Sequence, residues 1–122
     1  MNTTEIGNSL VSMCKEGRDH EALDTLFAPD AVSIEAMSMP NMPQEMKGLD
    51  AIKGKGAWWR DNHIVHSVKV EGPYPNGDRF AVRLGYDITR KQSGERVKMD
   101  EVALYTVKNG KIVREEFFYL TG

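Results

Sequence analysis

Apolar residues recur at helical spacing near the start of the chain. They form a first stripe of Ile6, Leu10, Val11, Met13 and Cys14 and a second of Ala22, Leu23, Leu26 and Phe27. Spacing by three and four residues predicts amphipathic helices. Asn2 can cap the first helix, with Glu5 at the capping-box position, and Gly17 can end it. The second helix is expected to start near Asp19 and to end before Pro29.

Strand-like alternation begins after Pro29, where Ser33 and Glu35 alternate with apolar neighbours. Such alternation indicates a strand with two different faces. Glu35 is either an ordinary solvent-facing residue of this strand or an acid inside a pocket, and the alternation alone favours neither. Residues 38–48 follow, and they are expected to form a loop because they contain two prolines and a glycine.

A third helix is expected from Leu49 to about Asp61, since Ile52, Gly56 and Trp59 share one helical face. The rest of the chain alternates at strand spacing over residues 64–70, 80–88, 96–108 and 111–120. The Asn-Gly pair between the last two strands is a strong hairpin signal. This order predicts an α+β fold, in which three N-terminal helices pack on one face of a curved antiparallel sheet.

Composition excludes several classes of protein. The length of 122 residues fits a single domain over residues 1–122. A net charge of -2 gives no basic excess, so a nucleic-acid partner is not expected. No apolar stretch is long enough for a membrane span, and the N-terminus has no signal-peptide pattern. With Cys14 as the only cysteine, an internal disulfide is excluded, and we expect a cytoplasmic protein.

Three segments, LDTLFAPDAVSIEA, GLDAI and YTVKNGKIVREEFFY, give the chain a family resemblance. In this order they resemble the nuclear transport factor 2-like superfamily, and its SnoaL-like branch most closely. The resemblance covers nearly the whole chain and implies a cone-shaped fold, in which a bent sheet wraps around helices and leaves a pocket. The superfamily includes ketosteroid isomerases, polyketide cyclases, epoxide hydrolases, dehydratases and members without catalysis, so the fold does not fix the activity.

The resemblance also implies roles for particular residues. In ketosteroid isomerases, a segment similar to FAPDAVSIEA carries the catalytic aspartate at the position of Glu35. Glu35 would then be a base that removes a proton beside a carbonyl group and returns it. The family's second acid, which donates to the oxyanion, has its nearest counterpart in Asp100. The family's oxyanion tyrosine on the first helix has no counterpart here, because Leu10 and Val11 occupy that region.

The hairpin turn predicts which residues of the last two strands share a face. A two-residue turn pairs Lys108 with Lys111, and counting outward places one set of residues together: Asp100, Val102, Leu104, Thr106, Val113, Glu115, Phe117 and Tyr119. Both faces mix apolar and charged residues, so we expect both to be covered. We expect the face of Asp100 to line the pocket and the other face to contact a second subunit, which gives a homodimer through the sheet.

Several further side chains are pocket candidates. Val102 and Leu104 follow from the face assigned to Asp100. The aromatic residues Trp59, Tyr86, Phe117 and Tyr119 are either core residues or walls of a pocket for a small apolar molecule. Met37 and Met39 belong to a methionine-rich segment after Glu35. Methionine adapts to varied ligands, so this segment is either a lid over the pocket or a plug or dimer contact.

Histidines complete the list of candidates. His66 shares the alternation of Ile64 and Val68, so it is either a core histidine or an acid/base partner of a carboxylate. His63 and His66 are three residues apart at a helix-to-strand junction, where that spacing does not give a common face. The chain has no HExxH motif and no Cys/His cluster, so neither a metal nor a cofactor is expected.

Two functions remain open on this basis. The first is a cofactor-free isomerase or cyclase that moves protons on a small apolar carbonyl compound. Glu35 would be its base, and Asp100 or His66 would be the partner. The second is a non-catalytic protein that binds a small hydrophobic ligand, with Glu35 orienting that ligand. The acid at the base position favours the enzyme, whereas the missing tyrosine of the first helix favours the binding protein.

Overall fold

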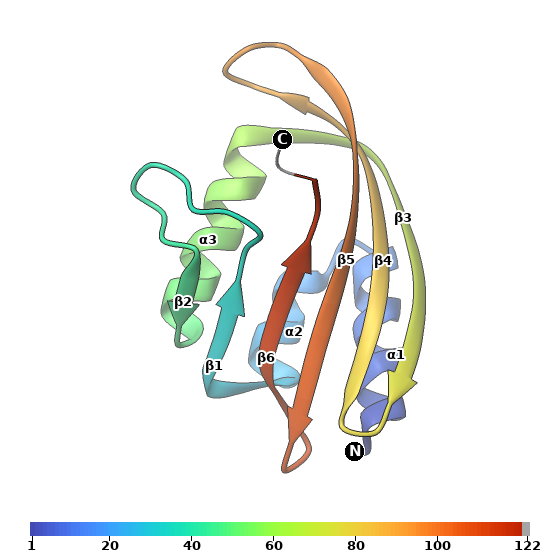
Figure 1. The fold of residues 1–122 in the computed structure, drawn as a ribbon. Coiled ribbons are helices and arrows are strands. Elements are labelled where there is room, and N and C mark those ends of the chain that lie inside the picture. Colours follow the sequence, from blue (N-terminus) through green and yellow to red (C-terminus); the bar gives the residue numbers. More distant parts are fainter. Residues whose placement is uncertain (121–122) are drawn as a thin grey trace.

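One curved, unclosed mixed sheet of six strands forms the framework of the protein, and three helices lie on one side of it (Figure 1). The structure is a computed structural model that describes residues 1–120. Its elements in chain order are α1 (Thr3–Lys15), α2 (Asp19–Thr25), β1 (Phe27–Ile34), β2 (Glu45–Lys47), α3 (Leu49–Asn62), β3 (His63–Asn76), β4 (Arg79–Arg90), β5 (Arg96–Lys108) and β6 (Lys111–Phe118). None of the helices within residues 1–120 is long and apolar enough to cross a membrane.

The predicted start of α1 and the predicted hairpin turn are confirmed by local geometry, whereas α2 ends at Thr25, before the expected end, and Phe27 already belongs to β1. The Asn2 side chain accepts a hydrogen bond from the Glu5 backbone N–H at 2.8 Å, and the Glu5 carboxylate accepts one from the Asn2 N–H at 2.9 Å. This reciprocal pair is the capping box expected for α1. Asn109 and Gly110 both have positive φ angles, of 52° and 74°, as a two-residue hairpin turn requires. Lys108 accordingly pairs with Lys111.

The sheet has the order β2-β1-β6-β5-β4-β3. Strands β3 to β6 pair antiparallel with one another, as predicted. The sheet is mixed because β1 runs parallel to β6. A short strand, β2, pairs antiparallel with β1 within the segment expected to be a loop. The parallel contact brings the end of β1, where Ser33 and Glu35 lie, beside the end of β6.

The core lies between the helices and the concave side of the sheet. Phe80 is fully buried and stacks on Tyr105 at a centroid distance of 4.9 Å. The other fully buried large side chains of this core are Ile6, Ile112 and Val82. Gly7 of α1 allows close approach to the sheet, because an added Cβ would lie 2.8 Å from the Pro73 Cβ. Burial of these apolar side chains is the main stabilising term of the fold.

A β-bulge in the last hairpin changes which residues face the core. Val107 opposes Ile112, but Thr106 opposes Arg114, so Val113 is an extra residue on β6. Beyond the bulge, Glu115 opposes Tyr105 on the inner face. The inner face of β5 therefore carries Glu101, Ala103, Tyr105 and Val107, whereas Asp100, Val102, Leu104 and Thr106 lie on the outer face. The expectation that Asp100 shares the face of Glu115, Phe117 and Tyr119 was wrong, because the count assumed a hairpin without a bulge.

Candidate functional site

Glu35 lies at the end of β1, beside an open pocket of about 330 Å³. The pocket is lined by Ile34, Glu35, Ala36, Gln44, Glu116, Phe117, Phe118 and Tyr119. The backbone N–H of Glu35 donates to the Gln44 carbonyl at 2.9 Å, and the Gln44 side-chain amide donates back to the Glu35 carbonyl at 3.1 Å. These two bonds hold the backbone of Glu35 at the pocket rim.

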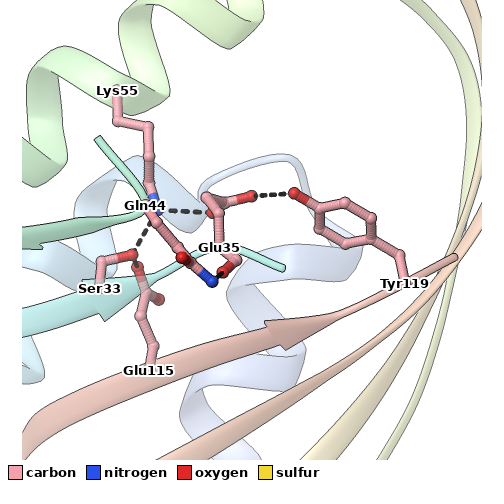
Figure 2. Close-up of polar contacts among 6 residues, drawn as sticks. All are labelled: Ser33, Glu35, Gln44, Lys55, Glu115 and Tyr119. Atoms are coloured by element: carbon pink, nitrogen blue, oxygen red, sulfur yellow. Dashed lines mark hydrogen bonds and ion pairs between the residues drawn. The ribbon is translucent and has the colours of Figure 1, made fainter. Parts of the chain in front are cut away.

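Lys55 is the nearest partner of Glu35 (Figure 2). Its Nζ lies 2.6 Å from Glu35 Oε2, and the two side chains are only 12% and 17% exposed. The same ammonium donates to Ser33 Oγ and lies 5.1 Å from the centre of the Phe117 ring. Lys55 reaches the strand because it stands three residues after Ile52 and four before Trp59, on the inner face of α3.

Glu115 stands behind this pair, in the interior. It is the register partner of Ser33 across the parallel β1–β6 contact, and it is only 6% exposed. Ser33 Oγ donates to Glu115 Oε1 at 2.7 Å, so Ser33 bridges Lys55 and Glu115 (Figure 2). Burial raises the pKa of Glu115 to about 7, and the Ser33 hydrogen bond and the Lys55 charge oppose that rise only in part.

Tyr119 approaches Glu35 from the other side. Its hydroxyl donates to Glu35 Oε1 at 3.0 Å (Figure 2). Burial and then the neighbouring Glu35 charge raise the pKa of Tyr119 to about 12, so the phenol keeps its proton and remains a donor near neutral pH. Both oxygens of Glu35 therefore accept a hydrogen bond, one from an ammonium and one from a phenol.

Glu101 is a third carboxylate of the interior. Burial, and next the neighbouring Glu35 charge, raise its pKa to about 7, and the Lys55 charge opposes this rise only in part. Within residues 1–120, no hydrogen bond or ion pair engages the Glu101 side chain. A carboxyl group with this pKa is partly protonated near neutral pH and can then donate a hydrogen bond.

Aromatic side chains continue the inner surface beyond Glu101. Trp59 of α3 packs on Tyr86 of β4 at a centroid distance of 5.2 Å, and His63 stacks on Trp59 at a centroid distance of 4.5 Å. Burial, followed by the Glu101 charge, raises the pKa of the Tyr86 hydroxyl. The structure thus brings Trp59, Tyr86, Phe117 and Tyr119 to the inner side, on the same side of the sheet as Glu35.

Asp100 and His66 are not part of this site, which corrects two predicted partners of Glu35. Asp100 lies on the outer face and pairs with Arg83 at 2.9 Å, with its side chain 66% exposed. The hydrogen bond from Arg83 lowers the pKa of Asp100. His66 is exposed, and its Nε2 lies 2.7 Å from Thr89 Oγ1. The register shifts between Val65 and Ser67, so His66 leaves the alternation that was expected to turn it inward.

Four predicted pocket residues also lie apart from Glu35 and its partners. Val102 and Leu104 are on the outer face for the same reason as Asp100, and Val102 is 41% exposed. Met37 is exposed, and Met39 forms a local backbone pair with Met42. Neither methionine is among the residues that line the pocket beside Glu35.

Lys55, Glu101 and Glu115 were not recognised as site residues from the sequence. Lys55 had a readable signal, because it shares the helical face of Ile52 and Trp59. Glu115 was on the face expected to line the pocket, whereas the inward position of Glu101 depends on the bulge at Val113, for which the sequence carries no clear mark. Among residues 1–120, no group of three or more potential metal-ligating His, Cys, Asp or Glu side chains is present.

Comparison with known proteins places this geometry in a family. Residues 1–119 match the family model described as a SnoaL-like domain. A protein from Mesorhizobium loti, described as a proposed SnoaL-like polyketide cyclase, is 47% identical, and the match covers 98% of this chain and 100% of that one with a TM-score of 0.92. Among curated proteins, no sequence matches this chain.

Two more distant structures share the fold alone. An NTF2-like protein from Burkholderia thailandensis is 18% identical, with 97% of this chain and 90% of that chain covered and a TM-score of 0.81. A protein from Catenulispora acidiphila with a ketosteroid isomerase-like fold, in complex with trimethylamine, is 23% identical, with 97% and 87% covered and a TM-score of 0.73.

Proposed function

The chain belongs to the family of SnoaL-like domains, and we propose that it catalyses cofactor-free proton transfer on a small apolar carbonyl compound. The observation that supports this most is the pair of inner carboxyl groups with different surroundings. Glu35 lines the pocket and is paired with Lys55, whereas Glu101 has a pKa raised to about 7. Carboxyl groups whose environments differ in this way are suited to separate base and acid roles.

In the proposed reaction, the Glu35 carboxylate removes a proton from the carbon next to the substrate carbonyl. The electron pair of the broken C–H bond moves into a new C–C double bond, and the carbonyl oxygen gains the negative charge. The protonated Glu101 carboxyl group or the Tyr119 hydroxyl donates a hydrogen bond to that oxygen. Glu35 then returns the proton to carbon. Alternatively, the enolate carbon forms a bond to a second carbonyl carbon of the same molecule, and the alkoxide produced there takes the proton from Glu35.

The apolar side chains support the substrate class. Phe117 lines the pocket beside Glu35, and Trp59 and Tyr86 extend the aromatic surface on the inner side. A volume of about 330 Å³ suits a small molecule. Glu101 takes the place that the sequence had suggested for Asp100, since it is the acid of that strand on the inner face.

A non-catalytic ligand-binding protein is the second candidate. Both oxygens of Glu35 already accept hydrogen bonds, from Lys55 and from Tyr119, so the protein itself holds the carboxylate in place. In this case Glu35 and its partners would orient a ligand rather than react with it. The trimethylamine complex of the Catenulispora acidiphila protein agrees with small-ligand binding in this fold.

A thermal-shift panel of small ketones, aldehydes and polyketide-like compounds, followed by an exchange assay, separates the two candidates. Bound compounds are incubated in D₂O, and deuterium incorporation next to the carbonyl is followed by NMR. For the enzyme, we expect Glu35→Gln to bind the compound and to lose exchange, whereas Asp100→Asn exchanges normally because Asp100 lies on the outer face. Binding without exchange in the unmodified protein would support the binding protein instead.

We also propose that the protein forms a homodimer through the outer face of the sheet. Val102 and Phe118 are direct cross-strand partners there, 41% and 50% exposed. Tyr74 adds a third exposed large apolar side chain. Apolar groups that are adjacent on a sheet face are typical of a contact surface.

A further inference from the structure

Glu115 is a buried acid that the proposed reaction does not use. It is 6% exposed, and its side chain accepts one hydrogen bond among residues 1–120, from the fully buried Ser33 hydroxyl. Burial of a carboxylate costs free energy unless the group is paired. The presence of an acid at this buried position therefore calls for a physical explanation. The reason is not tighter apolar packing, because a methionine or leucine would fill similar space without that cost.

Hydrogen bonds connect Glu115 to Glu35 through Ser33 and Lys55. The Lys55 ammonium donates to Ser33 Oγ, and Ser33 Oγ donates to Glu115. Lys55 also donates to Glu35 at 2.6 Å. One ammonium is therefore shared between Glu35, which it contacts directly, and Glu115, which it reaches through one hydroxyl (Figure 2).

We propose that Glu115 is a positioning residue for Glu35, and that its protonation sets how strongly Lys55 is held against the Glu35 carboxylate. This inference deepens the proposed function and rests on it for its catalytic meaning. When Glu115 is neutral, the Lys55 charge is balanced by Glu35 alone. When Glu115 is ionised, Lys55 is shared between two anions, so Glu35 is less neutralised and becomes a stronger base.

Other titratable groups face the same interior, and the experiment must distinguish their ionisation from that of Glu115. Glu101 of β5 is the main one, since its pKa is also raised to about 7. Burial raises the pKa of Tyr105 on β5, of Tyr119 on β6 and of Cys14 on α1, so these groups stay protonated near neutral pH. Asp19 of α2 contributes a negative charge that acts on Glu115 and Cys14.

The test is an NMR titration of the Glu35 carboxyl carbon, which needs no substrate. The protein is labelled with ¹³C at glutamate carboxyl carbons, and Glu35→Gln assigns the Glu35 resonance. We expect the Glu35 resonance to show an inflection near pH 7, which reports the ionisation of Glu115. The inflection should be lost in Glu115→Gln and in Ser33→Ala, and it should persist in Glu101→Gln. An exposed acid that pairs with Arg90 provides the control Glu95→Gln, which should leave it unchanged.

Each outcome decides the inference. An inflection that persists in Glu115→Gln, or that disappears in Glu101→Gln, assigns the effect to another acid and overturns the proposal. An inflection unchanged in Ser33→Ala means that Glu115 acts by distant charge alone, which refutes the positioning role. If Glu115→Gln does not fold, Ser33→Ala still tests the bridge because it leaves both acids in place. If the Glu35 resonance shows the inflection that depends on Glu115 but no carbonyl compound exchanges deuterium, the proposed reaction is rejected. The link between Glu115 and Glu35 then still stands.

Discussion

Replacing Glu115 by glutamine should change how the stability of the protein depends on pH. The folded protein binds a proton on Glu115 with a pKa of about 7, whereas the ordinary carboxyl value is 4.5. Unfolding between these two values releases a proton, so rising pH favours the unfolded chain. The stabilising effect of the raised pKa is full below about pH 4.5 and is lost as the pH rises through about 7.

The size of the effect follows from the same two values. The interval from 4.5 to about 7 corresponds to about 3 kcal/mol, at about 1.4 kcal/mol for each pH unit. Glutamine fills nearly the same volume and cannot ionise, so the variant does not lose this stabilisation as the pH rises. The free energy of unfolding of Glu115→Gln, relative to the unmodified protein, should therefore rise by up to about 3 kcal/mol between pH 4.5 and pH 8.

Urea unfolding followed by circular dichroism at several pH values measures this difference directly. Ionic strength is kept constant, and the comparison uses the pH trend, so a fixed packing difference between the two side chains cancels. The corresponding change in melting temperature is roughly 10 °C for a chain of this size. Glu95→Gln, an exposed acid, should give a flat trend. A flat trend for Glu115→Gln as well would refute the claim that a buried carboxyl group in this position titrates near pH 7.

Three further expectations concern the interior and the outer face. Lys55→Met should cost about 3 kcal/mol in urea unfolding at pH 7, because it leaves the largely buried Glu35 carboxylate without its ion-pair partner. Gly7→Ala should lose about 1 kcal/mol, since the new Cβ would lie 2.8 Å from Pro73 and this clash exceeds the gain in helix propensity. Val102→Lys should convert the proposed dimer to a monomer in sedimentation velocity, because it places a charge at the centre of the apolar outer patch.

Control substitutions at comparable positions distinguish these specific effects from a general loss of stability. Lys53→Met removes an exposed lysine of the same helix that pairs with Asp24, and it should leave the free energy of unfolding close to that of the unmodified protein. Gly54→Ala adds a Cβ with nothing within 4 Å, so it should stabilise α3 by about 1 kcal/mol. Equal losses from Lys53→Met and Lys55→Met, or a loss from Gly54→Ala, would contradict the packing described for α3. A monomeric unmodified protein would reject the proposed dimer.

The sequence predicted the parts of the fold that depend on neighbouring residues. The capping box of Asn2 and Glu5 and the Asn109-Gly110 turn are local interactions, so their residue types are enough to identify them. The contact of β1 with β6 joins residues about 80 positions apart, as in the hydrogen bond between Ser33 and Glu115. No local pattern encodes such a pairing, and its parallel direction was not predicted.

The candidate site was predicted only in part, and the errors on strands β3 and β5 have one physical origin. A bulge moves every following residue of a strand to the other face, because side chains alternate with a period of two. The bulge at Val113 exchanged Asp100 for Glu101 as the inner acid, and the register shift at His66 turned that histidine outward. Glu35 lies before both irregularities. Its place beside the pocket agrees with the alternation of its own strand, although its catalytic role stays a prediction.

The central claim is that Glu35 moves protons on a carbonyl compound bound in the pocket beside it. The most direct measurement is the rate of deuterium exchange next to the carbonyl of a bound compound, in the unmodified protein and in Glu35→Gln, at saturating compound. Removal of a general base typically costs about 10²- to 10⁴-fold in rate, and we expect a loss in that range with binding retained. Exchange at the same rate in Glu35→Gln would contradict the claim.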